Sequence, residues 1–382
     1  MSLFPRFHRL AVSLILFVFL TAPGFAQAPT QEAIRQSDAI AVEMKALAEQ
    51  GDTDGARRKA QEASVRFKAQ GEAWLAASYA VSAADYAMRA GDAAGVDAEY
   101  YPRMQELLAT LDPVEETRAN LLLELLMNAK GKLGDKDRQD ALGELYEERI
   151  RKAHGKNSEQ DIDGRVRTAY SLLENGRLED GLKKIRAALA ASQKTELHGV
   201  TLRHYTQIAR SLHASGLNDE AAAFFHEAEQ TRAIRADAKE LADFYLAYAE
   251  FRTAVPDPQQ HFVPLYSMAT NLFARFYGHE SPELIHATDK LATALSDVGQ
   301  YGTAIDLERR NYEIAQKSLG DDDTVTWRIA NNLADMLRGL GSPSRALEYD
   351  LKVLENRTRH YGQNHFNTLV SANNTAQNYL DL

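Results

Sequence analysis

Glycines at a nearly constant interval constrain the fold of this chain more than any other feature of its sequence. They are Gly51, Gly91, Gly131, Gly176, Gly216, Gly299 and Gly341. The intervals are 40 to 45 residues, apart from one of 83 residues that is close to two periods. The turn residue expected within this longer interval would fall at Asp257, in the turn-like sequence of residues 255–258. Such a period, with helical pattern between the marks, is typical of a helical solenoid, which builds an extended surface rather than a deep pocket.

The first 26 residues have the layout of a secretory signal peptide. Arg6 and Arg9 give a basic start, residues 10–20 form an apolar run, and small residues follow as far as Ala26. Residues 1–26 are therefore a predicted signal peptide, cleaved after Ala26. The mature chain is expected in the periplasm or outside the cell of a bacterium. The apolar run is too short for a membrane span, and an uncleaved membrane anchor is the alternative.

Composition excludes several classes of function. The sequence contains no cysteine, so disulfides and thiolate chemistry are excluded. The net charge is −10 and becomes −12 once Arg6 and Arg9 are removed with the signal peptide. A strongly acidic protein is a poor ligand for nucleic acid or for an anionic membrane surface. The mature chain should be soluble, with neither of these as a partner.

The pattern between the glycines is helical, and no segment alternates like a strand. Helices are expected over residues 31–50, 54–70, 73–90, 94–110, 117–129, 137–153, 164–174, 178–191, 197–214, 219–234, 239–253, 260–277 and, at the end of the chain, 364–382.

Small residues recur at fixed offsets from the glycines. Around Gly216 they are Ala209, seven residues before it, with Ala221 and Ala228 five and twelve residues after it. Two helices of a hairpin approach closely only where side chains are small, so these positions predict the contact line within each hairpin. Other members of the set are Ala56, Ala63, Ala169, Gly181, Ala188, Ala292, Ala304, Ala334 and Ala346.

The last repeats carry a more specific pattern. Gly278, Gly320 and Gly362 are 42 residues apart, within the loop sequences Tyr-Gly-His, Leu-Gly-Asp and Tyr-Gly-Gln, and residues 331–334 read Asn-Asn-Leu-Ala. This pattern resembles the tetratricopeptide repeat family, and the last repeats are similar to the 42-residue form found in kinesin light chains. The resemblance implies an all-α, right-handed superhelical solenoid of about eight helix-turn-helix repeats plus a terminal helix. Residues 27–160 would be divergent N-terminal repeats and residues 161–382 the C-terminal repeats.

The resemblance also implies a partner-binding groove. In this family the first helix of each hairpin lines a concave groove, at positions 13, 10, 6 and 3 before the turn glycine. The positions that point to a partner-binding groove are Arg203, Thr206, Arg210, His213, Arg328, Asn331, Asp335, Arg338, Asn373 and Gln377. The same offsets select His286, Asp289, Thr293, Ser296, Val370 and Leu380. Asn can bond both groups of an extended peptide backbone, and Arg can hold a carboxylate.

Two alternatives to this interpretation remain open. In the first, the selected residues are polar only because exposed helix faces generally are, and they bind no partner. At the Asp257 turn the offsets select Phe244, Ala247, Phe251 and Ala254, which would form an apolar stretch of groove, or else ordinary core if the register slips there.

Motifs for catalysis or metal binding are weak. Residues 161–164 read Asp-Ile-Asp-Gly but lack the remaining ligands of a calcium loop, and a helix-capping loop explains them better. The acidic run of residues 321–323 is best explained by Asp323 as an N-cap. We therefore expect no catalytic residue, no metal site and no cofactor.

The sequence favours a non-catalytic, exported scaffold that binds a peptide or protein partner in its groove. One alternative is the sensing or regulatory repeat region of a larger protein or enzyme that continues past Leu382. Another is self-assembly through stacked repeat ends, and the oligomeric state is left open. The terminal helix is either a polar cap, through residues such as Asn373, Asn374, Thr375, Gln377, Asn378 and Asp381, or the start of a further repeat.

Overall fold

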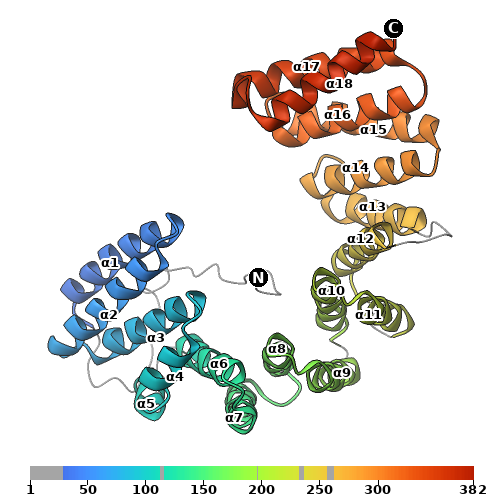
Figure 1. The fold of residues 1–382 in the computed structure, drawn as a ribbon. Coiled ribbons are helices and arrows are strands. Elements are labelled where there is room, and N and C mark those ends of the chain that lie inside the picture. The colour runs from blue at the N-terminus through green and yellow to red at the C-terminus, as the bar shows by residue number, and fades with distance from the viewer. Residues whose placement is uncertain (1–28, 112–115, 196, 232–235, 256–261) are drawn as a thin grey trace. The chain divides into compact units, whose positions relative to one another are not determined.

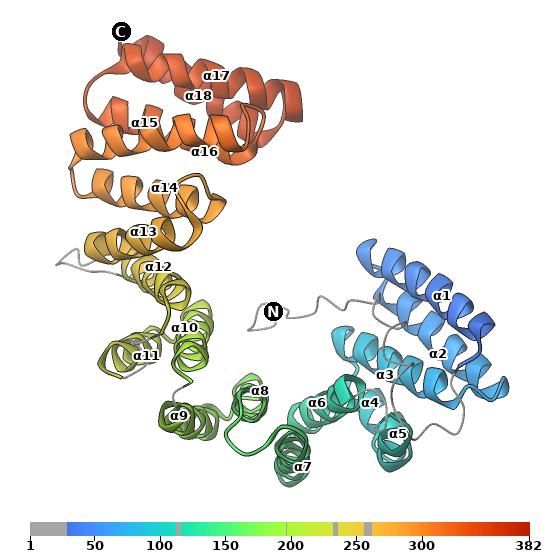
Figure 2. The same cartoon turned by 180° about the vertical axis from the view of Figure 1, so that it is seen from behind.

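The computed structural model describes residues 29–111, 116–195, 197–231, 236–255 and 262–382 (Figures 1 and 2). Within these ranges the chain forms eighteen helices and no strand, which confirms the all-α prediction. No helix in the described ranges is long and apolar enough to cross a membrane. The predicted signal peptide and the turn around Asp257 lie outside the described residues.

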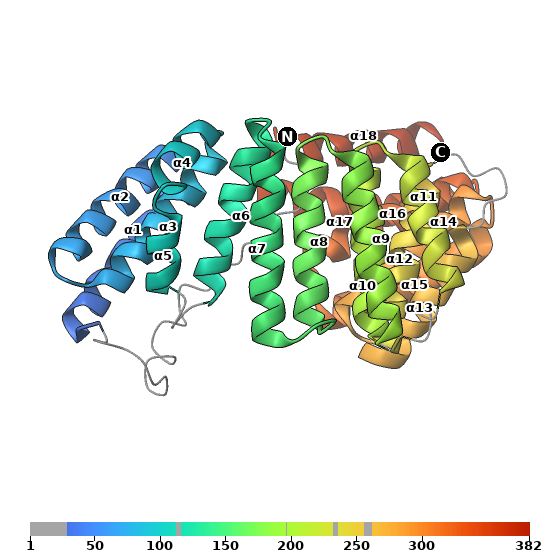
Figure 3. The ribbon, with the colours of Figure 1, turned by 90° about the horizontal axis from the view of Figure 1, so that it is seen from below.

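Contacts divide the chain into two compact units, of which the first ends at Thr195 and the second begins at Glu196. In the first unit most helices pack on the next helix of the chain, and α4 packs on α6. Figure 3 shows α6 to α9 side by side. Its helices are α1 (Gln31–Glu49), α2 (Thr53–Ala69), α3 (Ala73–Arg89), α4 (Ala93–Tyr100), α5 (Met104–Leu111), α6 (Glu116–Lys132), α7 (Lys136–His154), α8 (Glu159–Glu174) and α9 (Leu178–Lys194).

The second unit repeats the same plan. Its helices are α10 (His198–Ala214), α11 (Asn218–Gln230), α12 (Ala238–Ala254), α13 (Phe262–Tyr277), α14 (Pro282–Asp297), α15 (Tyr301–Ser318), α16 (Thr324–Gly339), α17 (Pro343–Tyr361) and α18 (Phe366–Leu380). With α4 and α5 taken together, the described residues form eight consecutive helix pairs followed by α18, which confirms the predicted number of repeats. We call α10, α12, α14, α16 and α18 the first helices of this unit.

One predicted helix is broken in two. Residues 94–110 were expected to form a single helix, but α4 ends at Tyr100 and α5 begins at Met104. Pro102 lies in the gap. Because proline has no N–H and its ring collides with the preceding turn, it interrupts a helix interior.

The turn glycines have the backbone that only glycine adopts easily. Six of the seven periodic glycines have φ between +76° and +85°. The prediction for Gly131 is wrong, because this residue lies inside α6 and the turn is made by Gly134, with φ of +76°. With Gly134 in its place the intervals become more regular, at 43 and 42 residues on either side.

Aspartate follows three of these glycines and caps the next helix. The carboxylates of Asp52, Asp92 and Asp135 accept hydrogen bonds from the backbone N–H three residues on, at 2.7, 2.8 and 3.3 Å. Each Gly-Asp pair thus ends one helix and starts the next within two residues. The Asp323 cap is also confirmed, since its side chain accepts from Val325 N–H at 2.7 Å.

The loop predicted at residues 161–164 is instead the first part of α8. Ser158 caps this helix by accepting a hydrogen bond from Asp161 N–H at 3.1 Å. The Asp161 carboxylate, in turn, accepts from Asn157 N–H at 2.7 Å. This acidic group therefore braces a helix start.

The predicted contact line within the hairpins is confirmed. Ala209, Ala221 and Ala228 are fully buried between α10 and α11. The other predicted positions are buried as well, with exposures of 0 to 2% for the alanines. Phe224 and Phe225 fill the space beside the line in this hairpin.

The terminal helix matches the predicted polar cap only in part, because Asn373, Gln377 and Asp381 are exposed and the other predicted residues are not. Thr375 and Asn378 are buried, and Asn374 donates to the Asn331 side chain at 3.4 Å. These polar groups therefore face the rest of the unit. The outward side of α18 carries apolar side chains, among them Phe366 and Leu369, beside the exposed polar residues.

The contact line can be tested by adding volume to it. Ala209→Leu should lower the free energy of unfolding by about 1–3 kcal/mol, because the extra methylenes force α10 and α11 apart. Ala214→Leu, at an exposed position of the same helix, should change it by no more than about 0.5 kcal/mol. Urea denaturation of both variants checks the prediction, and equal effects would contradict it.

Candidate functional site

The first helices of the second unit carry polar side chains that bond from one repeat to the next. We call Arg210, Glu250, His286, Asp289, Arg328 and Asn331 the polar row. The Arg210 guanidinium on α10 lies 3.2 Å from the Glu250 carboxylate on α12. The other oxygen of Glu250 lies 3.9 Å from His286 Nε2 on α14. Burial lowers the pKa of His286, and the nearby charge of Arg328 lowers it further, so this imidazole is neutral at neutral pH.

The row continues from α14 to α18. The Asp289 carboxylate on α14 is buried, and it forms an ion pair with Arg328 and accepts from Asn332 at 2.7 Å. Asn331 accepts from Asn374 on α18 at 3.4 Å. Each of these bonds therefore joins the first helices of two successive repeats.

A second carboxyl group lies beneath Asp289. Glu308, on α15, is fully buried and accepts from the side-chain amide of Asn311 at 3.3 Å. Burial and the adjacent Asp289 charge raise the pKa of Glu308 well above its ordinary value. A proton on Glu308 can be shared with Asp289, so a single negative charge faces the Arg328 guanidinium.

The next repeat has a similar cluster. Asp350 on α17 takes the place of Glu308, one period of 42 residues later. It is buried, forms an ion pair with Arg338 and accepts from Asn378 at 2.6 Å. Burial raises the pKa of Asp350, and the bonds from Arg338 and Asn378 limit the rise. Arg338 also pairs with Asp335 on its own helix.

The structure brings most of the predicted groove residues onto this set of helices but gives them different roles. Arg203, Arg210, Asp335, Asn373 and Gln377 are exposed. His213, Arg328, Asn331 and Arg338 are half-buried.

Two polar residues selected by the offsets, Thr206 and Asp289, are not presented to solvent. Thr206 is buried, and its hydroxyl donates to the Leu202 carbonyl within α10 at 2.8 Å, so its prediction as a groove residue is wrong. Asp289 is likewise buried, where it neutralises Arg328. In both cases the offset selects a position at the boundary between the exposed face of the helix and the buried core.

A small depression lies beside Arg210. It has a volume of about 100 Å³ and is lined by Arg210, His213, Phe225, Ala247, Glu250 and Phe251. Phe244 and Phe251 are buried and pack their rings on Phe225, which favours the core interpretation of these aromatics. The depression thus has an apolar floor and a charged rim.

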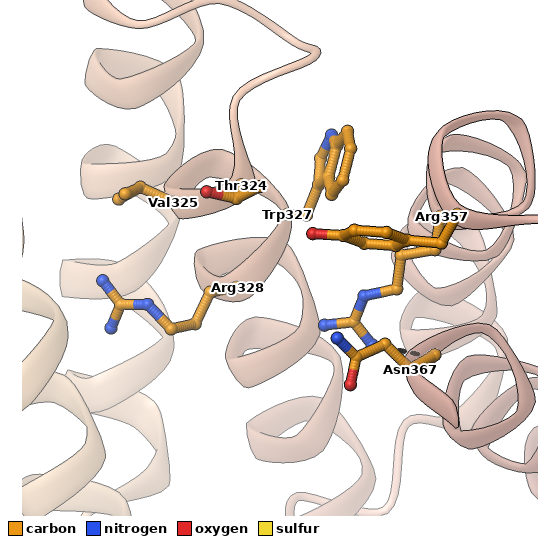
Figure 4. A pocket seen from close by; sticks show the side chains of 7 residues that line it. Thr324, Val325, Trp327, Arg328, Arg357 and Asn367 are labelled. Carbon is orange, nitrogen blue, oxygen red and sulfur yellow. Dashed lines mark hydrogen bonds between the residues drawn. The ribbon is translucent and has the colours of Figure 1, made fainter. Parts of the chain in front are cut away.

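A larger depression of about 270 Å³ lies at the start of α16 (Figure 4). Trp327 donates its indole N–H to the Asp321 carbonyl at 2.7 Å. Arg357 of α17 donates to the Asn367 carbonyl at 3.3 Å, and Figure 4 shows Asn367 beside its guanidinium group. In the same view the Arg328 side chain extends away from Trp327.

The sequence offsets missed Glu250 and Arg357. Glu250 links three helices, but its repeat lacks a turn glycine, and counting from Asp257 instead selects the adjacent Phe251. Arg357 lies on a second helix, which the groove pattern does not sample. Among the described residues no group of three or more acidic or histidine side chains could hold a metal ion.

Residues 284–324 and 328–367 match the family model described as tetratricopeptide repeat. This region consists of tetratricopeptide repeats. The recognition made from the loop sequences around Gly278, Gly320 and Gly362 is thereby confirmed. Tetratricopeptide repeats generally bind proteins or peptides.

Several solved structures are similar to this chain. The BtubC (BKLC) protein of P. vanneervenii is 17% identical, with 58% of this chain and 84% of that chain covered and a TM-score of 0.42. A kinesin light chain protein of Podosopora anserina with nearly identical repeats is 19% identical, with coverages of 54% and 99% and a TM-score of 0.44. A Rap protein complexed with competence and sporulation factor is 15% identical, with coverages of 91% and 100% and a TM-score of 0.33. No curated protein matches the sequence.

The raised pKa of Glu308 predicts how stability depends on pH. In the unfolded chain this group ionises above about pH 4.3, whereas the folded chain keeps its proton to higher pH. Stability should therefore fall as the pH rises through this range, because the unfolded state releases the proton first. Glu308→Gln removes the ionisation and supplies an N–H donor to Asp289. It should raise the urea midpoint at neutral pH and have little effect below about pH 4.

The control for this experiment is Glu313→Gln, at an exposed position on the same helix. Urea denaturation at a series of pH values compares both variants with the wild type. A Glu308→Gln difference that is the same at every pH would contradict the prediction.

Proposed function

We propose that this chain is a non-catalytic, exported tetratricopeptide repeat scaffold that holds a peptide or protein partner along the polar row. The observation that carries the proposal is the depression beside Arg210. It combines a charged rim with an apolar floor, on the helices that present the row.

The chemistry of the polar row and of the exposed residues beside it suits an extended peptide. Asn331 and Asn373 offer amide groups that can both donate to and accept from a backbone. The depression has room for about three waters, or for one small apolar side chain. A peptide lying along the row would place a side chain there, while its acidic groups meet Arg203 and Arg210.

The arginines on the first helices of the second unit are not equivalent as binding groups. Arg328 and Arg338 neutralise the buried Asp289 and Asp350, so replacing either leaves a buried charge without its partner. Arg210 is half-exposed, and its partner Glu250 is also solvent-accessible. Arg210 is therefore the residue whose loss reports on binding rather than on folding.

Removing Arg210 should weaken peptide binding. A display library of linear peptides is panned on the immobilised wild-type chain, and the enriched peptides are measured by fluorescence anisotropy. Arg210→Ala should raise their Kd by about tenfold or more, as expected for a charged anchor at the centre of an interface.

Arg309→Ala is the matched control. Arg309 is 48% exposed, against 50% for Arg210, and it pairs with Asp306 at 3.3 Å on α15, outside the row. The Kd of the Arg309→Ala variant for the enriched peptides should equal that of the wild type. A library that yields no binding peptide, or peptides equally affected by both variants, would overturn the proposed function.

The proposed export is tested separately. Expression of the full chain in a bacterium, followed by fractionation and mass spectrometry, should give a periplasmic or secreted product that begins at Gln27. A variant with Leu16→Arg in the apolar run should remain in the cytoplasm at full length. A wild-type product that keeps Met1 and sediments with membranes would show an uncleaved anchor instead.

A further inference from the structure

The depression at the start of α16 holds a charged group that the proposed function does not use. Arg357 is half-buried, and its Nη1 donates to the Asn367 carbonyl at 3.3 Å and to the Ser371 hydroxyl at 2.8 Å. Within the described residues its Nε and Nη2 have no hydrogen-bond partner, and no carboxylate lies within ion-pair distance. Burial lowers the pKa of Arg357, but a guanidinium stays charged in a protein. Its positive charge is therefore not neutralised by an ion pair.

The acidic groups around the depression have partners of their own. Asp350 forms the ion pair with Arg338. In the loop before α16, the three carboxylates of residues 321–323 accept from other groups, which belong to Gln316, Arg359 and the Val325 backbone. The described part of the chain therefore provides no counterion for Arg357.

The preceding repeat shows what these positions hold when they only pack. One period of 42 residues earlier, the corresponding residues are apolar and belong to one core cluster. They are Ala315, Val325 and Ile329, in place of Arg357, Asn367 and Ser371. Ala315 is fully buried on α15, which packs on both α14 and α16. A charge without a counterion is unfavourable at such a position, and departures of this kind are expected at functional sites.

The polar side of the depression can hold an anion. Figure 4 shows the Asn367 side chain beside the Arg357 guanidinium, and both Asn367 and Thr324 are exposed. Arg328 also lines the depression, but it is paired with Asp289. Arg357 is therefore the anchor for a negative group, with an amide and a hydroxyl as further donors.

The other side of the depression is apolar. Trp327, Tyr361 and Val325 line it, and the Trp327 indole N–H is already bonded to the Asp321 carbonyl. The volume of about 270 Å³ has room for about nine waters. A ligand of that size can place a carboxylate on Arg357 and a small apolar group against these rings.

We propose that this depression binds a carboxylate that carries a small apolar or aromatic group, with Arg357 as its anchor. Arg357 donates to both carboxylate oxygens through Nε and Nη2, and the Asn367 amide adds a further bond. The carboxylate belongs either to a free small acid or to the C-terminus of a peptide. The proposal does not depend on the depression beside Arg210, and Arg210→Ala should leave this binding unchanged.

The first test uses the fluorescence of Trp327. The chain has two tryptophans, and Trp74→Phe leaves Trp327 as the only one. Titration of this variant with N-acetyl-phenylalanine should change the emission and saturate, with a Kd of about 1 mM or below, as for other ligands of this size. N-acetyl-phenylalanine amide has nearly the same shape without the charge, and it should bind at least about tenfold more weakly.

Arg357→Ala, made in the same Trp74→Phe background, removes the anchor and introduces the residue that Ala315 represents one repeat earlier. It should raise the Kd at least about tenfold and keep the urea midpoint or raise it, because an unpaired charge is lost. Arg359→Ala is the matched control, since it removes the same charge from an exposed position of α17 that pairs with Asp322. Its Kd for N-acetyl-phenylalanine should equal that of the Trp74→Phe variant.

Four results would overturn the proposal. They are a titration that does not saturate, an amide that binds as tightly as the acid, equal effects of the two arginine variants on the Kd, and a lower urea midpoint for Arg357→Ala. The last result would show that Arg357 serves packing instead.

A tetrapeptide that ends in phenylalanine distinguishes the two sources of the carboxylate. An affinity at least about tenfold higher than that of N-acetyl-phenylalanine would assign the site to a peptide C-terminus, because the added residues then contribute contacts. An equal or lower affinity would assign it to a free acid. Either result supports the carboxylate site, whereas a C-terminally amidated tetrapeptide that binds as tightly as the free one would contradict it.

Discussion

The close approach of paired helices at small side chains is the contact on which every repeat depends. Ala209, Ala221 and Ala228 are fully buried, and their counterparts in the other hairpins are buried as well. A larger side chain at any of these positions would separate the two helices and shift the next repeat. The polar row needs the resulting spacing, because Arg210 and Glu250 meet at 3.2 Å only if successive first helices lie at the correct distance.

The sequence predicts the fold well because its strongest signals are obligatory. A turn that needs positive φ selects glycine, as at Gly216, and close helix packing selects alanine. Locating turns by the spacing of glycines fails where a glycine is needed for close packing rather than for a turn. Gly131 is also glycine, but in α6, where a Cβ would collide with the side chains of Asn175 and Gln139. The break at Pro102 could have been read from the sequence.

The candidate site is less predictable, because its roles depend on residues far away in the sequence. The offset rule places Arg328 and Arg338 on the correct helices. It cannot show that the second helices place the buried carboxyl groups of Glu308 and Asp350 close to these two arginines. The burial of Thr206 also depends on the neighbouring helices rather than on its own position in the helix.

The bonds of the polar row join residues only 36 to 43 positions apart. Contacts of such short range close small loops, and proteins built from them fold quickly. A repeat of this chain can thus reach its final packing as soon as the next repeat has been synthesised. With no cysteine, no step of this assembly waits for oxidation.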